Sequence, residues 1–306
     1  MEKKLAFVLV AVLVSGGLLI VVGNAVADIG AYAEAAHEEV WNNRAGNRVL
    51  SNVSLSSNTI YVPDDYAKIQ WAVNNATAGD TIIIRDGIYN ENVDVKKRLT
   101  IQSDNGVDKT IVQAKNSNDH VFDVTADYVN ISGFTVKGAT TEYQYYTAGI
   151  YLFGASYCNI SNNNVSNKHD GIDLYESSNN IIANNNANWN SDDGIVLAED
   201  SSNNIIANNS ANWNSNDGII LADESSNNVI ANNNANWNSD DGIVLADASS
   251  NNVIANNNAN WNRREGIVIE DSSNNNNISN NNALNNHCGI YIGYSSNNII
   301  ANNNAN

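Results

Sequence analysis

The chain is poor in residues that cross-link, stiffen or bind soft metals. Its 306 residues include two cysteines, one proline and one methionine, and 15 basic side chains stand against 33 acidic ones. Two cysteines cannot form a disulfide framework, and with so few sulfur ligands a binding site for a soft metal ion is not expected. The formal charge of −18 argues against nucleic acid or an anionic membrane surface as a partner, because both require a cationic footprint.

Asparagine is the residue in excess. It occupies 62 of the 306 positions, and 48 of these lie between Asn159 and Asn306. Because 42% of the residues are hydrophobic, the chain can still bury a core, which argues against wholesale disorder. We therefore expect the asparagines to be structural.

The first 27 residues have the pattern of an export signal. Lys3 and Lys4 precede an apolar run over residues 5–22, and Ala25 and Ala27 are the small residues that a cleavage site requires. We predict a cleaved signal peptide over residues 1–27, or an uncleaved N-terminal anchor as the expected membrane contact. Either one places the rest of the chain at the cell surface or outside the cell, with residues 28–58 as a linker or stalk.

The sequence repeats with a period close to 24 residues. The unit SSNNIIANNNANWNSDDGIVLAED begins at Ser177 and recurs with few changes at Ser201, Ser225 and Ser249. A Gly-Ile pair recurs at intervals of 22 to 24 residues, at Gly149, Gly171, Gly194, Gly218, Gly242, Gly266 and Gly289. Such a period indicates a solenoid, in which each unit buries its apolar face only against its neighbours.

Each repeat contains three short strand-like pieces, such as residues 180–183, 186–188 and 194–197. Three strands and three turns make one coil of a parallel β-helix, in which successive coils stack about 4.8 Å apart. We predict an all-β fold over residues 59–306, with irregular coils over 59–152 and regular coils over 153–306. The last repeat stops in mid-coil, so we expect the full protein to continue.

Three columns of Asn, which begin at Asn180, Asn185 and Asn190, are expected at strand ends. There Asn tolerates the left-handed turn conformation, and its amide can bond to the Asn above and below.

A short helix is expected to cap the first coil. After a strand over residues 59–62, the helix would begin at Pro63–Asp65 and end near Asn75. Its apolar face comprises Tyr66, Ile69 and Val73. A cap is physically reasonable, because the end of a β-helix is an unpaired edge.

The run IQWAVNNATAGDTIIIRDGIYNENVDVKKRLTIQS (Ile69–Ser103) resembles the opening of pectin-lyase-like right-handed β-helix proteins. The SSNNxIxxN…GIxL repeats resemble the NosD-like, CASH-type members of that superfamily, which are common in archaeal surface proteins. The resemblance runs from about residue 59 to the end and implies a right-handed helix. It implies no single activity, because the superfamily includes lyases, hydrolases, esterases and non-catalytic surface proteins.

Most of the acidity falls in two columns. The first precedes the Gly-Ile pair and comprises Asp170, Asp193, Asp217, Asp241 and Glu265. The second follows the Gly-Ile strand and includes Glu176, Glu199, Asp223, Asp247 and Asp271. Carboxylates at coil spacing repel one another and favour cations, salt or raised pKa values. Two interpretations remain open, a solvated acidic edge or Ca²⁺ bridging between coils with Asp193, Asp217, Asp241 and Glu265 as ligands.

A single active centre is expected where the repeat is broken. The outward row of the Gly-Ile strands reads Tyr151, Asp173, Val196, Ile220, Val244, Val268 and Tyr291. Asp173 is the charged residue of this row, and His169 and Asp170 lie near it in sequence. These three are candidate catalytic residues for cleaving a sugar chain, with an ordinary variable coil as the alternative.

Aromatic side chains are candidates for carbohydrate binding. Four tyrosines lie in or beside a non-repeat loop, at Tyr143, Tyr145, Tyr146 and Tyr151. One tryptophan recurs in each regular repeat, at Trp189, Trp213, Trp237 and Trp261. Turned inward these rings would be core, and turned outward they would form a stacking platform. The sequence leaves both open.

Copper handling, which the NosD resemblance implies, gains no support from the residues. Copper trafficking uses clusters of Met, Cys and His, whereas Met1 is the single methionine and the four histidines are scattered. Cys158 and Cys288 are five or six coils apart, too far to form a disulfide.

We therefore predict an exported cell-surface or envelope protein that contacts carbohydrate or protein without catalysis. The alternative is a polysaccharide lyase or glycoside hydrolase. Ca²⁺ is the one cofactor considered.

Overall fold

The computed structural model describes residues 8–14, 17–23, 57–139 and 147–306. The chain divides into two units, Met1–Ser54 and Leu55–Asn306. In the first unit, β1 (Val8–Val14) pairs antiparallel with β2 (Gly17–Gly23), so the apolar run forms two strands where we considered one spanning segment. Within the described residues, no helix is long and apolar enough to cross a membrane. Cleavage of this segment stays a prediction, and nearly all of the expected linker lies outside the described residues.

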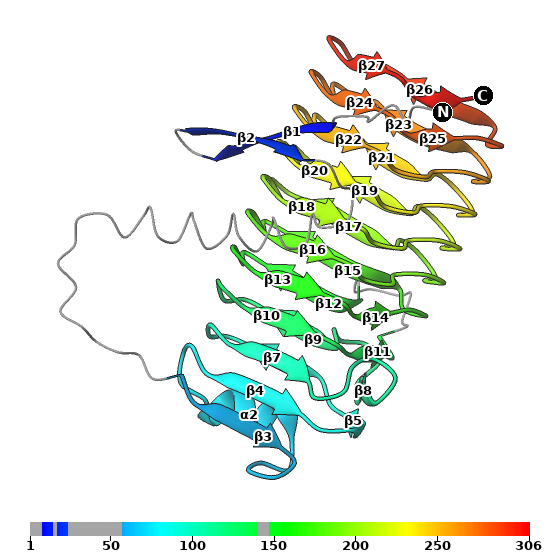
Figure 1. Cartoon of the computed structure of the whole chain (residues 1–306). Helices are drawn as coiled ribbons and strands as arrows, with labels where there is room; N and C mark the ends of the chain where they lie inside the picture. Colours follow the sequence, from blue (N-terminus) through cyan, green and yellow to red (C-terminus); the bar gives the residue numbers. More distant parts are fainter. Residues whose placement is uncertain (1–7, 15–16, 24–56, 140–146) are drawn as a thin grey trace, which may run out of the picture. The chain divides into compact units, whose positions relative to one another are not determined.

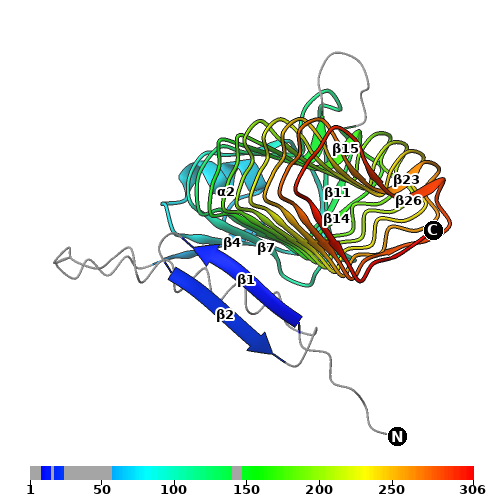
Figure 2. The same cartoon turned by 90° about the horizontal axis from the view of Figure 1, so that it is seen from above.

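The second unit is a stack of coils that forms a parallel β-helix, as the repeat predicts (Figures 1 and 2). Its first face is an 11-stranded sheet in which every pairing is parallel. The strands of this sheet are β3 (Thr59–Val62), β4 (Thr81–Ile84), β7 (Thr100–Ser103), β10 (Asn130–Ser132), β13 (Asn159–Ser161), β16 (Ile181–Ala183), β18 (Ile205–Ala207), β20 (Val229–Ala231), β22 (Val253–Ala255), β24 (Asn277–Ser279) and β27 (Ile299–Ala301).

The second face is a nine-stranded sheet that carries the Gly-Ile pairs. Its strands are β6 (Val93–Val95), β9 (Phe122–Val124), β12 (Ala148–Phe153), β15 (Asp170–Tyr175), β17 (Ile195–Ala198), β19 (Ile219–Leu221), β21 (Ile243–Leu245), β23 (Glu265–Ile269) and β26 (Cys288–Ile292). The repeat spacing keeps these strands in register, for example Ile195 with Ile219 and Leu197 with Leu221.

The third face differs from the expectation of three strands in every coil. Early coils form a four-stranded sheet of β5 (Gly87–Asn90), β8 (Thr110–Gln113), β11 (Thr135–Lys137) and β14 (Asn164–Val165). In the regular repeats the third strand shrinks to one bridging residue per coil, at Asn186, Ser210, Asn234 and Asn258. A short pair, β25 (Asn282–Ala283) and β28 (Asn304–Ala305), follows. The strand expected over residues 186–188 is reduced to one bridging residue, because it lies between two corners of the chain, at Asn184 (φ 57°) and Trp189 (φ 62°).

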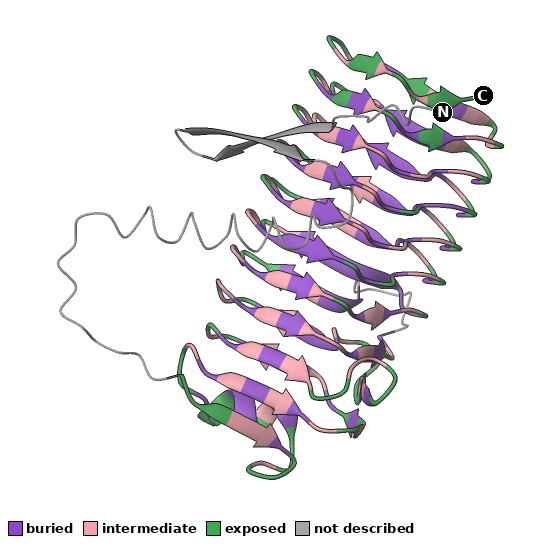
Figure 3. Ribbon diagram, viewed as in Figure 1, coloured by how far each residue is buried: buried purple, intermediate pink, exposed green. Residues whose placement is uncertain are grey.

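Alternating side chains fill the interior with a continuous apolar core. Ile and Leu at the inward positions are fully buried in successive coils, such as Ile195 and Leu197, Ile219 and Leu221. Figure 3 shows the buried residues recurring along the strands from coil to coil.

Each regular coil turns three corners with the same two-residue device. The first residue has the left-handed conformation, and φ is 62° at Asn179, 57° at Asn184 and 62° at Trp189. The second is a buried Asn, at Asn180, Asn185 and Asn190. The prediction that the column Asn themselves adopt the left-handed conformation is thus wrong by one residue. The left-handed residue is the one before each column Asn, and the column Asn that follows it points its side chain inward.

The buried Asn side chains join each coil to the coil before it. The backbone N–H of Asn180 donates to Oδ1 of Asn204 (2.7 Å), and Nδ2 of Asn204 donates to the carbonyl of Ser177 (3.0 Å). At the second corner, Nδ2 of Asn185 also donates to Oδ1 of Asn209 (3.1 Å), which confirms the predicted amide-to-amide bond there. One carboxamide therefore satisfies both a donor and an acceptor of the neighbouring coil.

The cap helix is present but begins later than expected. Helix α2 (Ile69–Asn75) lies at the β3 end of the stack (Figure 1), and its buried residues are Ile69, Ala72 and Val73. The Glu91 carboxylate accepts the N–H groups of Ile69 (2.9 Å) and Gln70 (3.1 Å), which favours a helix start at that point. Residues 63–65 instead form a turn.

Removing one ladder carboxamide should destabilise the stack. Asn209 is fully buried, accepts from Asn185, and donates to the Ile182 carbonyl (2.8 Å). Asn209→Ala should therefore lower the free energy of unfolding by about 2–4 kcal/mol, because buried backbone groups lose their partners. Chemical denaturation measures the change. The control Asn186→Ala, at an exposed position, should shift it by less than about 0.5 kcal/mol, and equal losses in both variants would contradict the ladder.

Candidate functional site

The outer face of the nine-stranded sheet changes character along the stack. Strand register confirms the predicted outward row from Tyr151 to Tyr291, with Tyr151 beside Asp173 and Asp173 beside Val196. The structure extends the row by two carboxylates that the sequence analysis missed, Asp94 and Asp123. The alternation Val-Asp-Val and Phe-Asp-Val around them was the signal. One face thus carries carboxylates and tyrosine in the early coils and aliphatic residues later.

Aromatic rings gather on the early part of this face. His120 stacks on Tyr151 with ring centroids 4.1 Å apart, and Phe153 lies 6.3 Å from Tyr151 and 5.8 Å from Tyr175. Phe153 is 44% exposed. Together with Asp123 and Asp173 these residues form what we call the aromatic–carboxylate patch, which comprises His120, Asp123, Tyr151, Phe153, Asp173 and Tyr175.

Asp173 is buried although it points away from the core. It is 7% exposed, and its Oδ1 atom has no hydrogen-bond partner. Desolvation raises the pKa of Asp173 to about 8, and the charge of Asp170 adds to this while His169 opposes it. The carboxyl group is therefore largely protonated at neutral pH. A protonated buried carboxyl is the form in which a general acid acts.

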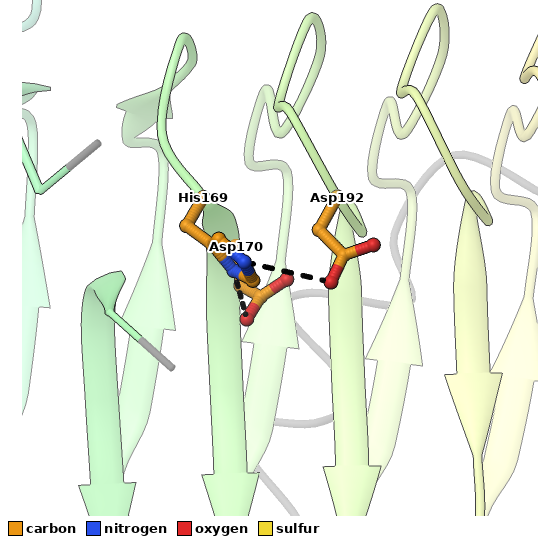
Figure 4. Close-up of side chains that lie close together, drawn as sticks. All are labelled: His169, Asp170 and Asp192. Atoms are coloured by element: carbon orange, nitrogen blue, oxygen red, sulfur yellow. Dashed lines mark hydrogen bonds and ion pairs between the residues drawn. The ribbon is translucent and has the colours of Figure 1, made fainter. Parts of the chain in front are cut away.

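The other two catalytic candidates are hydrogen-bonded to each other. Nδ1 of His169 lies 3.1 Å from Oδ2 of Asp170, and Nε2 lies 3.7 Å from Oδ2 of Asp192. Figure 4 shows the imidazole between the two carboxylates, which come from neighbouring coils. One nitrogen and two oxygens within 4.8 Å of one another could hold a divalent metal ion. The structure therefore brings His169 and Asp170 into contact, and the charges of both act on the pKa of Asp173.

The first acidic column is not a solvated edge. Asp193, Asp217 and Asp241 are 6–8% exposed, and each accepts the backbone N–H of the next coil, as in the 2.7 Å bond from Asp217 to Oδ1 of Asp193. Desolvation raises the pKa of Asp217 to about 7 and that of Asp241 to about 8, and it raises the pKa of Asp193 well above the usual value. The solvated-edge interpretation suits the second column, whose members such as Glu199 and Asp247 are exposed.

The Trp column lies at the third corner with its rings outward. Trp189, Trp213, Trp237 and Trp261 are 42–55% exposed. The first three stack on one another, with centroids 5.0 and 4.9 Å apart and interplanar angles of 3° and 7°. Both faces of Trp213 are thus covered by its neighbours, and solvent meets ring edges. Such stacks stabilise neighbouring coils by about 0.5–1.5 kcal/mol each.

The remaining candidates are placed as follows. Tyr143, Tyr145 and Tyr146 lie outside the described residues. Cys158 and Cys288 are both free thiols. Beside the first acidic column, Arg264 contacts Asp240 (3.2 Å) and Glu265 (3.7 Å) and offsets part of the negative charge there.

The chain belongs to the right-handed β-helix family. A family model described as "Right handed beta helix region" matches residues 148–305, just over half of the chain. This match and the parallel sheets confirm the right-handed fold that the resemblance implied.

Comparison with known proteins adds one relative and several solved structures. A "Cell surface glycoprotein" of Methanothermus fervidus is 35% identical over 104 residues, a stretch that covers 33% of this chain and 16% of that protein. The A-module of the mannuronan C-5 epimerase AlgE4 of Azotobacter vinelandii has a TM-score of 0.67 at 20% identity, over 78% of this chain and 73% of that one.

Two lyases share the same fold. Pectate lyase Pel9A has a TM-score of 0.57 at 17% identity, over 83% of this chain and 80% of that one. An alginate lyase of Paenibacillus sp. has a TM-score of 0.54 at 16% identity, over 78% of this chain and 99% of that one. At these identities the likeness to the solved structures concerns the fold, which is pectin-lyase-like.

The buried carboxyl column should make stability depend on pH. Because the pKa of Asp217 is about 7 in the folded state against about 4 in an unfolded chain, folding takes up protons between these values. Stability should therefore fall as pH rises from about 4 to about 8. Asp217→Asn, which keeps the acceptor oxygen, should stabilise the protein by about 1–3 kcal/mol at pH 8 and change little at pH 4.

Thermal melts of both proteins at the two pH values measure this effect. Asp247→Asn is the control, because Asp247 is exposed in the second column. An equal effect of Asp217→Asn at both pH values would contradict a column of raised pKa.

Proposed function

We propose that the chain is an exported cell-surface module that contacts carbohydrate through the aromatic–carboxylate patch without cleaving it. One observation carries this proposal, the concentration of Tyr151, Phe153 and Tyr175 rings beside Asp123 and Asp173 on one face of a rigid sheet. Sugar rings stack on aromatic faces, and carboxyl groups, ionised or protonated, form hydrogen bonds with sugar hydroxyl groups. The Trp column is a second exposed aromatic row, and its rings stack on one another as those of the patch do.

The proposed location rests on two features. The relative in Methanothermus fervidus is a cell surface glycoprotein, although the match spans only 16% of it. The N-terminal basic and apolar pattern supports export, either as a cleaved signal or as an anchor. NosD-like membership and an archaeal source belong to the same proposal.

We also propose that Ca²⁺ binds at the buried acidic column when its carboxyls are ionised. Carboxylate oxygens of Asp217, Asp240 and Asp241 come within 4.8 Å of one another, next to Asp193 and Glu265 in the same column. Hard oxygen ligands of this kind suit Ca²⁺, and a divalent charge would offset the repulsion between coils.

Calcium should stabilise the protein at high pH only. Since the pKa of Asp241 is about 8, protons compete with the ion below that pH. Millimolar Ca²⁺ should raise the melting temperature at pH 8.5 by a few degrees, on the order of 2–3 kcal/mol at saturation, and chelator should reverse this. At pH 5 the melting temperature should not respond. Asp241→Asn should abolish the response and Asp247→Asn should retain it, and an unchanged melting temperature at pH 8.5 would contradict the proposal.

A polysaccharide lyase or glycoside hydrolase is the second candidate function. It is favoured by the raised pKa of Asp173 together with the His169–Asp170 pair, because perturbed titratable groups cluster at catalytic sites. In that reading Asp173 donates a proton to the leaving group and His169 serves as base.

One set of incubations separates the two functions. The full chain is mixed with pectin, polygalacturonate, alginate and surface glycans, and both retention of the glycan and release of new chain ends are measured. We expect retention without release. Phe153→Ala should weaken retention about tenfold through lost stacking, whereas Tyr294→Ala, at a residue 90% exposed on the last coils, should not. Released ends that disappear in Asp173→Asn would instead establish the enzyme.

A further inference from the structure

One position of the third-corner Asn column is occupied by lysine. Lys168 precedes Asn190 by one coil, and its N–H donates to Oδ1 of Asn190 (3.0 Å), as the column Asn residues do to one another. The residue before it, Asn167, has φ 62°, as Trp189 has. A Cβ placed on Gly149 would lie 3.3 Å from Cγ of Lys168, just as one on Gly171 would meet Nδ2 of Asn190. The lysine stem therefore occupies the track that carboxamides fill in later coils.

The amine of Lys168 is buried. Lys168 is 1% exposed, and Nζ donates to the carbonyl of Ser166 (3.2 Å). Over residues 57–139 and 147–306, no carboxylate forms an ion pair with it. Burial and, to a smaller extent, the nearby charge of Lys137 together lower the pKa of Lys168 to about 7. An uncompensated buried ammonium is costly, and an anion at hand would remove that cost.

A pocket lies beside the four-stranded sheet, and Lys168 is among the residues that line it. Its volume is about 330 Å³, and it lies along β11 and β14, which pair in parallel (Figure 1). Its polar lining comprises Thr135, Lys137, Asn164, Ser166, Asn167 and Lys168. The lining thus includes two lysines together with hydroxyl and carboxamide residues, and none of the lining residues is acidic. In a chain of net charge −18, this is a local site for an anion.

We propose that this pocket binds the carboxylate group of an acidic sugar, a hexuronate unit, between the amines of Lys168 and Lys137. Both ammonium groups neutralise the carboxylate, and the Asn164, Ser166 and Asn167 side chains face the sugar hydroxyls. A pocket at the lower end of the usual ligand-site range, about 300–1,000 Å³, suits one or two sugar units. This site lies on a different sheet from the aromatic–carboxylate patch, so a test of one does not decide the other.

The carboxylate should bring a proton with it. In the free protein Lys168 is largely neutral at pH 8, because its pKa is about 7. A bound carboxylate favours the charged amine and raises that pKa, so binding at pH 8 takes up close to one proton, whereas binding at pH 6 takes up little.

Calorimetry on the full chain tests this with galacturonate as the probe. Titrations at pH 8 in two buffers of different ionisation enthalpy give the proton uptake. We expect galacturonate to bind with uptake of about 0.5–1 proton, and galactose, the neutral match, to bind at least tenfold more weakly. Lys168→Met should lose the uptake and at least tenfold in affinity. Lys137→Met should weaken binding and reduce the uptake, because removal of a neighbouring charge raises the pKa of Lys168. Lys109→Met, at an exposed residue, is the control and should change nothing.

Several outcomes would overturn the proposal. Two results would show that the amine has no role in binding. One is an equal affinity of the protein for galactose and galacturonate, and the other is an unchanged affinity of Lys168→Met for galacturonate when its melting curve is also unchanged. Acetate or sulfate binding as tightly as galacturonate would reduce the pocket to a small-anion site. If titration with millimolar galacturonate produces no heat of binding, the proposed site is ruled out. If Lys168→Met fails to fold, the Nζ titration of Lys168 in the unmodified protein decides, since an ordinary pKa near 10 without ligand contradicts an uncompensated amine.

Discussion

The stack depends on hydrogen bonds between coil corners. At each corner a left-handed residue turns the chain, and the N–H of the next residue then points along the stack, outside the strand pairing. A buried N–H without a partner costs about 1–3 kcal/mol, and three corners per coil would multiply that cost. The carboxamide of Asn204 provides partners for two backbone groups of the preceding coil, because it accepts the N–H of Asn180 and donates to the Ser177 carbonyl. The Asn excess follows from this requirement, because a carboxamide offers an acceptor and a donor side by side. The buried Ser201 hydroxyl serves the same purpose, since it accepts the N–H of Ser177 (3.0 Å) and donates to the Leu174 carbonyl (3.0 Å).

This constraint also explains the residues beside the ladder. A Cβ on Gly194 would lie 2.8 Å from Nδ2 of Asn214 and 2.9 Å from Cβ of Ala211, so the strand can pass the carboxamide only as glycine. Just before that glycine, Asp193 replaces the carboxamide by a carboxyl, which accepts the N–H of Asp217 in the following coil. The same bond then places a titratable group in a buried row. Acidic residues and Asn thus serve one geometry, and only the former make it sensitive to protons and cations.

Periodicity determines what could be predicted from the sequence. Strand alternation is rigid, so the interval between Gly-Ile pairs was enough to predict the register of Tyr151, Asp173 and Val196. Burial of Asp173 and Asp193 could not be predicted in this way, because it depends on how side chains of adjacent coils close over a position. The place of the Trp column was within reach, since Asn167 and Asn285 stand at equivalent positions, and both have φ near 60°. The ladder position of Lys168 could not be predicted, because a lysine that does not recur with the repeat gives no sign that it stands in the Asn column.

The regular coils are poorly suited to hold a single chemical centre. Their carboxamides do not titrate near neutral pH and are committed to the neighbouring coil, and their acidic column offers equivalent carboxyls in coil after coil. One segment departs from this uniformity in its buried side chains, where Lys168, His169, Asp170 and Asp173 lie within six residues and all are at least 90% buried. Lys168 places an amine where the ladder otherwise has a carboxamide, and Asp173 places a carboxyl group in the outward row, where later coils have aliphatic residues. Because each departure leaves a buried charge or an unpaired oxygen, the segment is more costly than a regular coil. Recognition of an anionic or sugar ligand would offset that cost, which is why we place both proposed contacts at this coil.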